Sequence, residues 1–123
     1  MKFERSIDTE ARIVILKVDG DLGDRDLLSL ADALERDPEV LRDFALLIDL
    51  REANGREVTS AGVQALAARS LVLSRESRRA VVVPSNLGFG MARMYEMLSE
   101  KRGGAARVFR DYSEALRWLE LGV

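Results

Sequence analysis

Four short apolar runs, two of them rich in β-branched residues, alternate with segments of helical spacing, and this alternation constrains the fold more than any other feature. The runs span residues 12–18, 44–50, 79–84 and 105–109. Runs of this kind are typical of strands buried inside a sheet. Strands that alternate with helices predict an α/β layer architecture with a mostly parallel sheet.

The helical segments are marked by apolar residues that recur three and four positions apart. We predict that Asp24 is the N-cap of the first helix, because its carboxylate can accept from free backbone N–H groups. That helix ends at Asp37-Pro38, since the residue before proline avoids the α region. Three further helices are predicted at about 60–74, about 87–100 and 112–119.

The N-terminal segment adds an antiparallel strand to this pattern. Residues 3–7, FERSI, alternate apolar and polar as a half-exposed edge strand does, and residues 8–11 form a plausible turn into the strand 12–18. The predicted order is ββαβαβαβα, in a single domain over residues 1–123 with a mixed, mostly parallel sheet. Ligands of such sheets gather beyond the carboxyl ends of the strands, where the loops 19–24, 51–60 and 84–90 are expected to meet.

The composition narrows the function. The chain has no cysteine and no histidine, which removes thiolate chemistry, sulfur-ligated metals and the commonest general base. The acids of segment 19–26 and Asp49 are explained by capping and solubility, so no catalytic residue, metal or cofactor is predicted and we expect no enzyme. A net charge of −2 gives no basic field for nucleic acid.

Targeting signals are also not expected. The N-terminus, MKFERSIDTEAR, is charged and lacks the apolar core of a signal peptide. No apolar run reaches membrane-spanning length. We therefore expect a cytoplasmic, bacterial protein.

The segment 54–66, NGREVTSAGVQAL, places two hydroxyls side by side where a helix begins. Thr59 or Ser60 can be an N-cap, whose loss costs about 1 kcal/mol. Alternatively, either hydroxyl can be a phosphorylation site, because a phosphate adds about −1.5 to −2 charge and is favoured at a helix N-terminus. The two interpretations are compatible, and the residues alone leave both open.

Three other residues are candidates for contacts with another protein. Phe89 falls between Gly88 and Gly90, a glycine pair that is not a nucleotide fingerprint, and we predict that it is exposed as a partner anchor. Met97 and Trp118 lie at the flanks of their helices' buried faces. Either one, or the edge strand 3–7, is a candidate contact of a homodimer.

Several local patterns resemble the STAS fold of bacterial anti-sigma-factor antagonists. They are VDGDL (18–22), LLIDL (46–50), TSAGVQAL (59–66) and FRDYSEALRWL (109–119), and the resemblance runs from about residue 3 to 121. It places Ser60 at the family's phosphorylatable serine and Gly62 at its glycine. Thr59 stands where the family has an aspartate, and the preceding loop is about two residues longer than usual.

The C-terminal half resembles a second group more closely. The segments DLREANG, RRAVVVPSNLGFGMARMYEML and RVFRDYSEALRWL look like small, uncharacterised bacterial proteins described as STAS-like or SEC14-like single domains. SEC14-like relatives bind lipids, so this resemblance implies a possible small-molecule function.

These patterns lead to a main hypothesis and two alternatives. The main hypothesis is a non-enzymatic regulatory module that binds another regulatory protein, a kinase or an anti-sigma-like factor, and is switched by phosphorylation at Ser60 or Thr59. Its expected partner-binding residues are Asp21, Asp24, Arg51, Glu57, Gly62, Ser85 and Phe89. The first alternative is a SEC14-like module for a lipid or small ligand, with a cavity between the sheet and the second or third helix and room left by Ala67, Ala68 and Ala92. The second is a structural homodimer without a ligand.

Overall fold

The computed structural model describes residues 1–69, 73, 77–84 and 86–120. The elements are β1 (Lys2–Asp8), β2 (Ile13–Gly23), α1 (Asp24–Arg36), β3 (Ala45–Glu57), α2 (Ser60–Ala68), β4 (Arg78–Val82), α3 (Asn86–Lys101), β5 (Ala105–Phe109) and α4 (Tyr112–Glu120). Their order, ββαβαβαβα, confirms the order predicted from the sequence.

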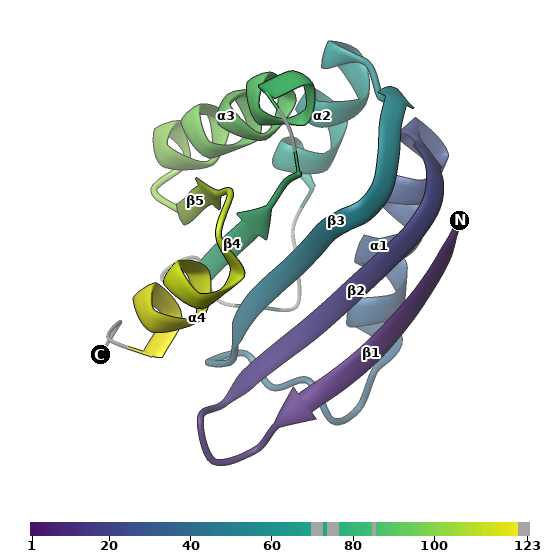
Figure 1. The fold of residues 1–123 in the computed structure, drawn as a ribbon. Coiled ribbons are helices and arrows are strands. Elements are labelled where there is room, and N and C mark those ends of the chain that lie inside the picture. The colour runs from purple at the N-terminus through teal and green to yellow at the C-terminus, as the bar shows by residue number, and fades with distance from the viewer. Residues whose placement is uncertain (70–72, 74–76, 85, 121–123) are drawn as a thin grey trace.

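The strands form one mixed sheet in the order β1-β2-β3-β4-β5. β1 is antiparallel to β2 at one edge, and the remaining neighbours are parallel. α4 lies in front of the sheet and α1 behind it (Figure 1). The architecture is therefore the three-layer α/β arrangement that the alternating pattern predicts.

Successive residues of the central strands point to opposite faces and build two separate cores. On the α4 face, Ile13, Leu47 and Val82 pack with Ala115 and Leu119 of α4. On the other face, α1 contributes Leu30 and Leu34 to the core, and α2 and α3 contribute Val63, Ala92 and Tyr95. The strand residues of this core include Val14, Leu16, Leu46 and Val81, and Val83 joins them just after β4. This second face, covered by α1, α2 and α3, carries the candidate site.

β2 and β3 extend beyond the predicted strand ends, so the predicted loops at 19–24 and 51–60 are wrong over most of their length. The two strands stay paired from Asp19 opposite Glu52 to Gly23 opposite Glu57, with irregularities in the register on the way. Gly20 has φ of 89°, which suits glycine and few other residues. Such irregularities bend and twist a strand pair, and β3 curves toward α2 at this end (Figure 1). We call residues 19–23 and 52–57 the arm.

Two helix boundaries also differ from the prediction. Gly23, and not Asp24, is the N-cap of α1, and its backbone N–H donates to Asp26 Oδ2 at 2.7 Å. Asp24 is thereby the first helical residue, and its carboxylate is free to contact α2. α2 ends at Ala68 with Arg69 as its C-cap in extended conformation, earlier than the predicted end near 74. Residues 70–72 and 74–76 of that predicted helix lie outside the described residues.

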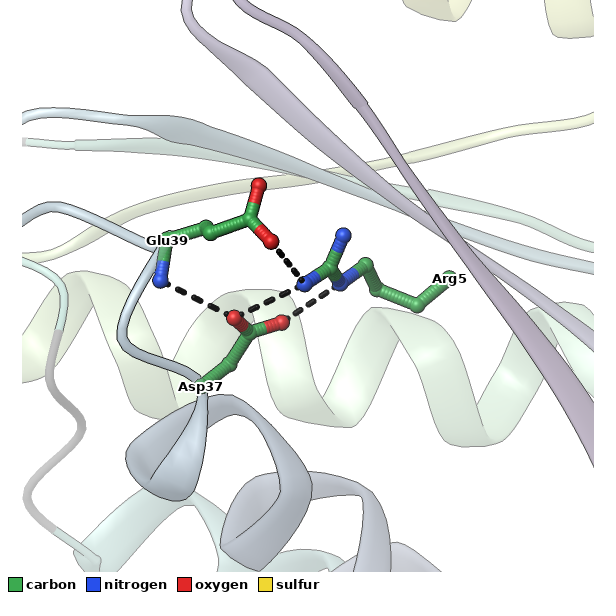
Figure 2. Close-up of polar contacts among 3 residues, drawn as sticks. All are labelled: Arg5, Asp37 and Glu39. Atoms are coloured by element: carbon green, nitrogen blue, oxygen red, sulfur yellow. Dashed lines mark hydrogen bonds and ion pairs between the residues drawn. The ribbon is translucent and has the colours of Figure 1, made fainter.

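An ion-pair cluster holds the sheet edge to the end of α1. Arg5 of β1 donates through Nε to Asp37 Oδ2 at 2.5 Å and through Nη2 to Asp37 Oδ1 at 2.9 Å and Glu39 Oε1 at 3.3 Å (Figure 2). The hydrogen bonds from Arg5 hold the pKa of Asp37 below its usual value. Because Asp37 is the C-cap of α1, this cluster helps fix where α1 lies over the sheet.

Candidate functional site

A cavity of about 400 Å³ lies between the sheet and the three helices on its α1 face. Its strand residues outside the arm are Leu16, Leu46, Ile48, Leu50 and Val81, and its helix residues are Leu27, Leu30, Ala31, Leu34, Val63, Leu66, Met91, Ala92 and Tyr95. Val83 and Pro84 line it just after β4, and the remaining lining comes from the arm and the residue that follows it, with Leu22, Ala53, Asn54, Gly55, Arg56 and Val58. The space is thus lined by residues from both halves of the chain.

The size of this cavity sets it apart from ordinary packing defects. Protein interiors hold few voids larger than a water molecule, whereas pockets for small molecules measure about 300–1,000 Å³ and are mostly apolar. Ala92 lines the cavity, as its predicted role of leaving room requires. Ala67 packs into the adjacent core and Ala68 is exposed, so the prediction is wrong for these two residues. α1 contributes more of the lining than α2, which the sequence did not suggest.

Few polar groups reach the cavity. Burial raises the pKa of Tyr95 above its ordinary value, so its phenol is neutral at physiological pH. At the arm, the backbone N–H of Arg56 donates to Asn54 Oδ1 at 3.1 Å, and the Arg56 Nε lies 3.4 Å from the same oxygen. Arg56 supplies the one charged side chain of the described lining. The cavity therefore suits an apolar ligand and offers a cation at its arm end.

The N-termini of α1 and α2 are joined beside the cavity through Thr59. Its backbone N–H donates to Asp24 Oδ1 at 2.8 Å, and its hydroxyl donates to Asp24 Oδ2 at 2.6 Å. The same hydroxyl accepts from the Gly62 N–H at 3.1 Å, which makes Thr59 the N-cap of α2. The two donors of Thr59 hold the pKa of Asp24 below its usual value. We call these three residues the rim network.

Gly62 is required by this network for a steric reason. A Cβ atom built at Gly62 would lie 2.0 Å from Asp24 Oδ1, well inside van der Waals contact. Ser60, by contrast, is the first residue of α2 and is exposed. The capping interpretation is therefore confirmed for Thr59, and modification of either hydroxyl stays a prediction.

A second polar contact joins α1 and α2 at the other end of α2. Arg69 forms ion pairs with Asp32 and with Glu35, the latter at 2.8 Å, and donates to the Leu28 carbonyl at 3.2 Å. Sequence reasoning missed Arg69, because its partners lie more than thirty residues away and no local pattern marks the pairing. α2 is thus attached to α1 at both of its ends.

The structure brings only some of the predicted partner-binding residues together. Glu57 ends β3 opposite Gly23, close to the rim network, and Asp21 is exposed on the arm opposite Asn54. Arg51 lies on the other face of the sheet, where it donates to Asp49 at 2.8 Å and stacks over the Tyr112 ring of α4. Burial opposes ionisation of Asp49, but the hydrogen bonds from Arg51 hold its pKa below the usual value.

The remaining candidates do not form an exposed anchor at the rim. Phe89 lies in α3, packs against the core, and has the Arg110 guanidinium 4.5 Å from its ring centroid, so its predicted exposure on a loop is wrong. Ser85 lies outside the described residues. Met97 is 55% exposed on α3 and stays a candidate dimer contact. Trp118 is partly buried against Phe109.

Other kinds of site are not found in the part of the chain that the structure describes. Within it, no three acidic, histidine or cysteine side chains gather closely enough to bind a metal ion. Over the same residues, none of the helices combines the length and the apolar character needed to cross a membrane.

Comparison with solved structures identifies a related fold. No protein-family model matches the sequence, and no curated protein matches it. The crystal structure of an uncharacterised protein of the DUF3478 family from Shewanella loihica, described as having a SpoIIAA-like fold, superimposes with a TM-score of 0.61. The match covers 96% of this chain and 92% of that chain at 18% sequence identity. The STAS-like fold predicted from the sequence is therefore confirmed: the chain has the SpoIIAA-like fold, that of anti-sigma-factor antagonists.

Proposed function

We propose that the protein is a non-catalytic binding module that holds one small apolar ligand in the cavity beneath α1, α2 and α3. The observation that supports this most directly is the cavity itself, with its volume of about 400 Å³ and its predominantly aliphatic lining. The chain has neither histidine nor cysteine. The polar side chains of the described lining, those of Asn54, Arg56 and Tyr95, form no acid–base pair, which favours binding over catalysis.

The physical basis of binding is the hydrophobic effect. Each methylene group that leaves water for such a lining gains about 0.8 kcal/mol. A ligand also restores dispersion contacts that side chains facing an empty space lack. The cavity lies between the sheet and the helices of the folded domain, so binding requires no unfolding of the domain.

The test is a titration of purified, delipidated protein with N-phenyl-1-naphthylamine, a neutral apolar dye that fluoresces when it leaves water. We expect saturable fluorescence and a higher melting temperature with dye. The variant Ala31→Leu/Ala92→Leu, which fills part of the cavity, should bind the dye more weakly. The variant Ala115→Leu alters the opposite core and should bind like the wild type. Absence of saturable binding, or equal binding by all three proteins, would contradict the proposal.

A second candidate function, a regulated contact with another protein, is supported by the position of Ser60. This serine is exposed at the start of α2, where a phosphate would meet the positive end of the helix dipole. It follows Thr59, which bonds the Asp24 carboxylate, so phosphorylation of this exposed serine would add negative charge at this end of α2 without entering the core. Thr59 is a poorer acceptor, because its hydroxyl is engaged by the Asp24 carboxylate.

This second candidate is tested with immobilised wild-type, Ser60→Ala and Ser60→Glu proteins. We expect Ser60→Glu to change the set of proteins captured from lysate of the native organism, while its melting temperature stays within a few degrees of the wild type. The intact mass of the endogenous protein should show a phosphorylated form. If all three proteins capture the same set of proteins and the endogenous protein has its unmodified mass, Ser60 is not a phosphorylation switch and only begins the helix α2.

A further inference from the structure

We infer that the ligand is a single-chain amphiphile with an anionic head, which lies against Arg56 while its chain fills the apolar cavity. This inference rests on the proposed ligand-binding function and adds the chemical class of the ligand. It is carried by the position of one cation at the end of an otherwise apolar space.

The cavity-facing residues of β3 change character along the strand. Leu46, Ile48 and Leu50 line the cavity over the sheet, and Asn54 and Arg56 line it at the arm. The lining is therefore aliphatic over the sheet, and at the arm it includes one cation among Ala53, Gly55 and Val58. A ligand that matches this lining has an apolar body and a negatively charged end.

Arg56 is available for such a head. Within the described part of the chain, no carboxylate lies within ion-pair distance of its guanidinium. Among the described residues, its side chain has one hydrogen-bond partner, the Asn54 Oδ1, which lies 3.4 Å from Nε. Five other arginines on the same chain are each paired with at least one acid, namely Arg5, Arg12, Arg51, Arg69 and Arg93.

The neighbouring acid does not neutralise Arg56. The Glu57 side chain lies toward Gly23, with its Oε2 3.8 Å from a Cβ built there. Glu57 is not among the residues that line the cavity. Arg56 thus presents its positive charge to the cavity end, and Glu57 directs its negative charge to the rim network.

The chemistry of guanidinium and the size of the space define the ligand further. A guanidinium forms paired hydrogen bonds with the planar oxygens of a carboxylate and with a phosphate monoester. A volume of about 400 Å³ is near the lower end of ligand pockets. One acyl chain fits that volume better than two, so a single-chain acid or phosphate is favoured over a diacyl lipid.

The expected selectivity is modest because Arg56 is exposed. An ion pair in contact with solvent is worth up to about a five-fold change in affinity, and screening by salt reduces it. We therefore expect the anionic head to give about a five-fold preference at low salt over a neutral head on the same chain.

The experiment compares dodecanoate, dodecyl phosphate and dodecan-1-ol as competitors of the naphthylamine dye, at low and at high salt. The proteins are the wild type, Arg56→Gln and Arg117→Gln. Arg117 is exposed on α4, across the sheet from the cavity, and its substitution changes the net charge equally. We expect the wild type and Arg117→Gln to prefer an anionic ligand about five-fold at low salt. Arg56→Gln should bind all three equally, with its dodecanol affinity unchanged.

The outcomes separate the inference from the proposed function. If the wild type binds dodecanol as tightly as both anions, the head-group assignment is wrong and the apolar site stands. If Arg56→Gln keeps the anionic preference, the head lies elsewhere and the assignment is again wrong. If none of the three compounds displaces the dye, the cavity does not take a single chain at all. A preference for dodecanoate or for dodecyl phosphate that disappears in Arg56→Gln supports the inference and identifies the head as carboxylate or phosphate.

Discussion

Substitution of Ala92 by leucine tests whether the space beneath the helices is truly empty. Ala92 is 8% exposed in α3 and lines the cavity. Leucine is nearly as good a helix former as alanine, so α3 itself is not weakened. The three added carbon atoms would enter the cavity without displacing a neighbour.

The size of the effect follows from burial. Three carbon atoms at about 0.8 kcal/mol each give an upper limit of roughly 2.4 kcal/mol. Fixing the leucine rotamer costs about 0.5–1 kcal/mol, so Ala92→Leu should stabilise the ligand-free protein by about 1–2 kcal/mol. The unfolding entropy of roughly 2.1 cal/mol/K per residue, applied to 123 residues, converts this into an increase in melting temperature of about 4–8 °C.

The assay is calorimetric unfolding of delipidated protein, with Ala115→Leu as the matched control. Ala115 is also a buried helical alanine, with 0% exposure, but it packs against the opposite face of the sheet and does not line the cavity. Overpacking there should destabilise the protein by about 1–3 kcal/mol. If Ala92→Leu lowers the melting temperature as much as Ala115→Leu does, the space is already filled and the reasoning fails.

Three further predictions concern the rim network. Gly62→Ala should lower the melting temperature in the wild-type background, because the new Cβ displaces the Asp24 carboxylate. In an Asp24→Ala background the same substitution should raise the melting temperature, because only the helix preference for alanine of about 1 kcal/mol remains. Equal effects of Gly62→Ala in the two backgrounds would contradict the steric account. Thr59→Val should cost about 1 kcal/mol in urea unfolding through loss of the N-cap, while Thr59→Ser should be nearly neutral; equal losses would show that the hydroxyl contributes nothing. The folded-state pKa of Asp24 is below its unfolded value of 3.8, so its contribution is complete above that pH and is lost as the pH falls through the folded value. The stability difference between wild type and Asp24→Asn should therefore shrink in urea titrations below about pH 4, and a constant difference down to pH 2 would argue against the hydrogen-bonded carboxylate.

The fold could be predicted because its signals are local. Short apolar runs such as 12–18 and 44–50 are recognisable from a few neighbouring residues, and their alternation with helices leaves few topologies. The arm was missed because residues 19–23 and 52–57 have glycine and charged residues typical of turns. Their pairing depends on two segments that lie more than thirty positions apart in the sequence, which no local pattern reveals.

The site was predictable only where it depends on helix capping. Thr59 was one of two candidate caps, since hydroxyls before a helix have a known role. Its bonds to Asp24 and the clearance required at Gly62 depend on how α1 meets α2, which a single sequence does not fix. Arg56 lies in a polar, glycine-containing segment, and nothing in its neighbours distinguishes a cation that faces a cavity from one that faces solvent.

The cavity is harder to predict than the fold or the capping contacts, because it is a volume and not a contact. Small helix residues such as Ala92 either let two layers approach or leave a gap between them, and the outcome depends on what holds the layers in place. Here α1 and α2 are joined at both ends by polar contacts, through Thr59 at one end and Arg69 at the other. Such contacts fix the spacing of the helices without filling the space below them. Thr59, one of the two residues that the sequence offered as a phosphorylation switch, is therefore also a support of the proposed ligand site. A phosphate on Thr59 would repel Asp24 and break one of these supports. The proposed ligand site and the less favoured of the two phosphorylation candidates thus meet at Thr59, and dye binding by a Thr59→Glu variant shows whether they are coupled.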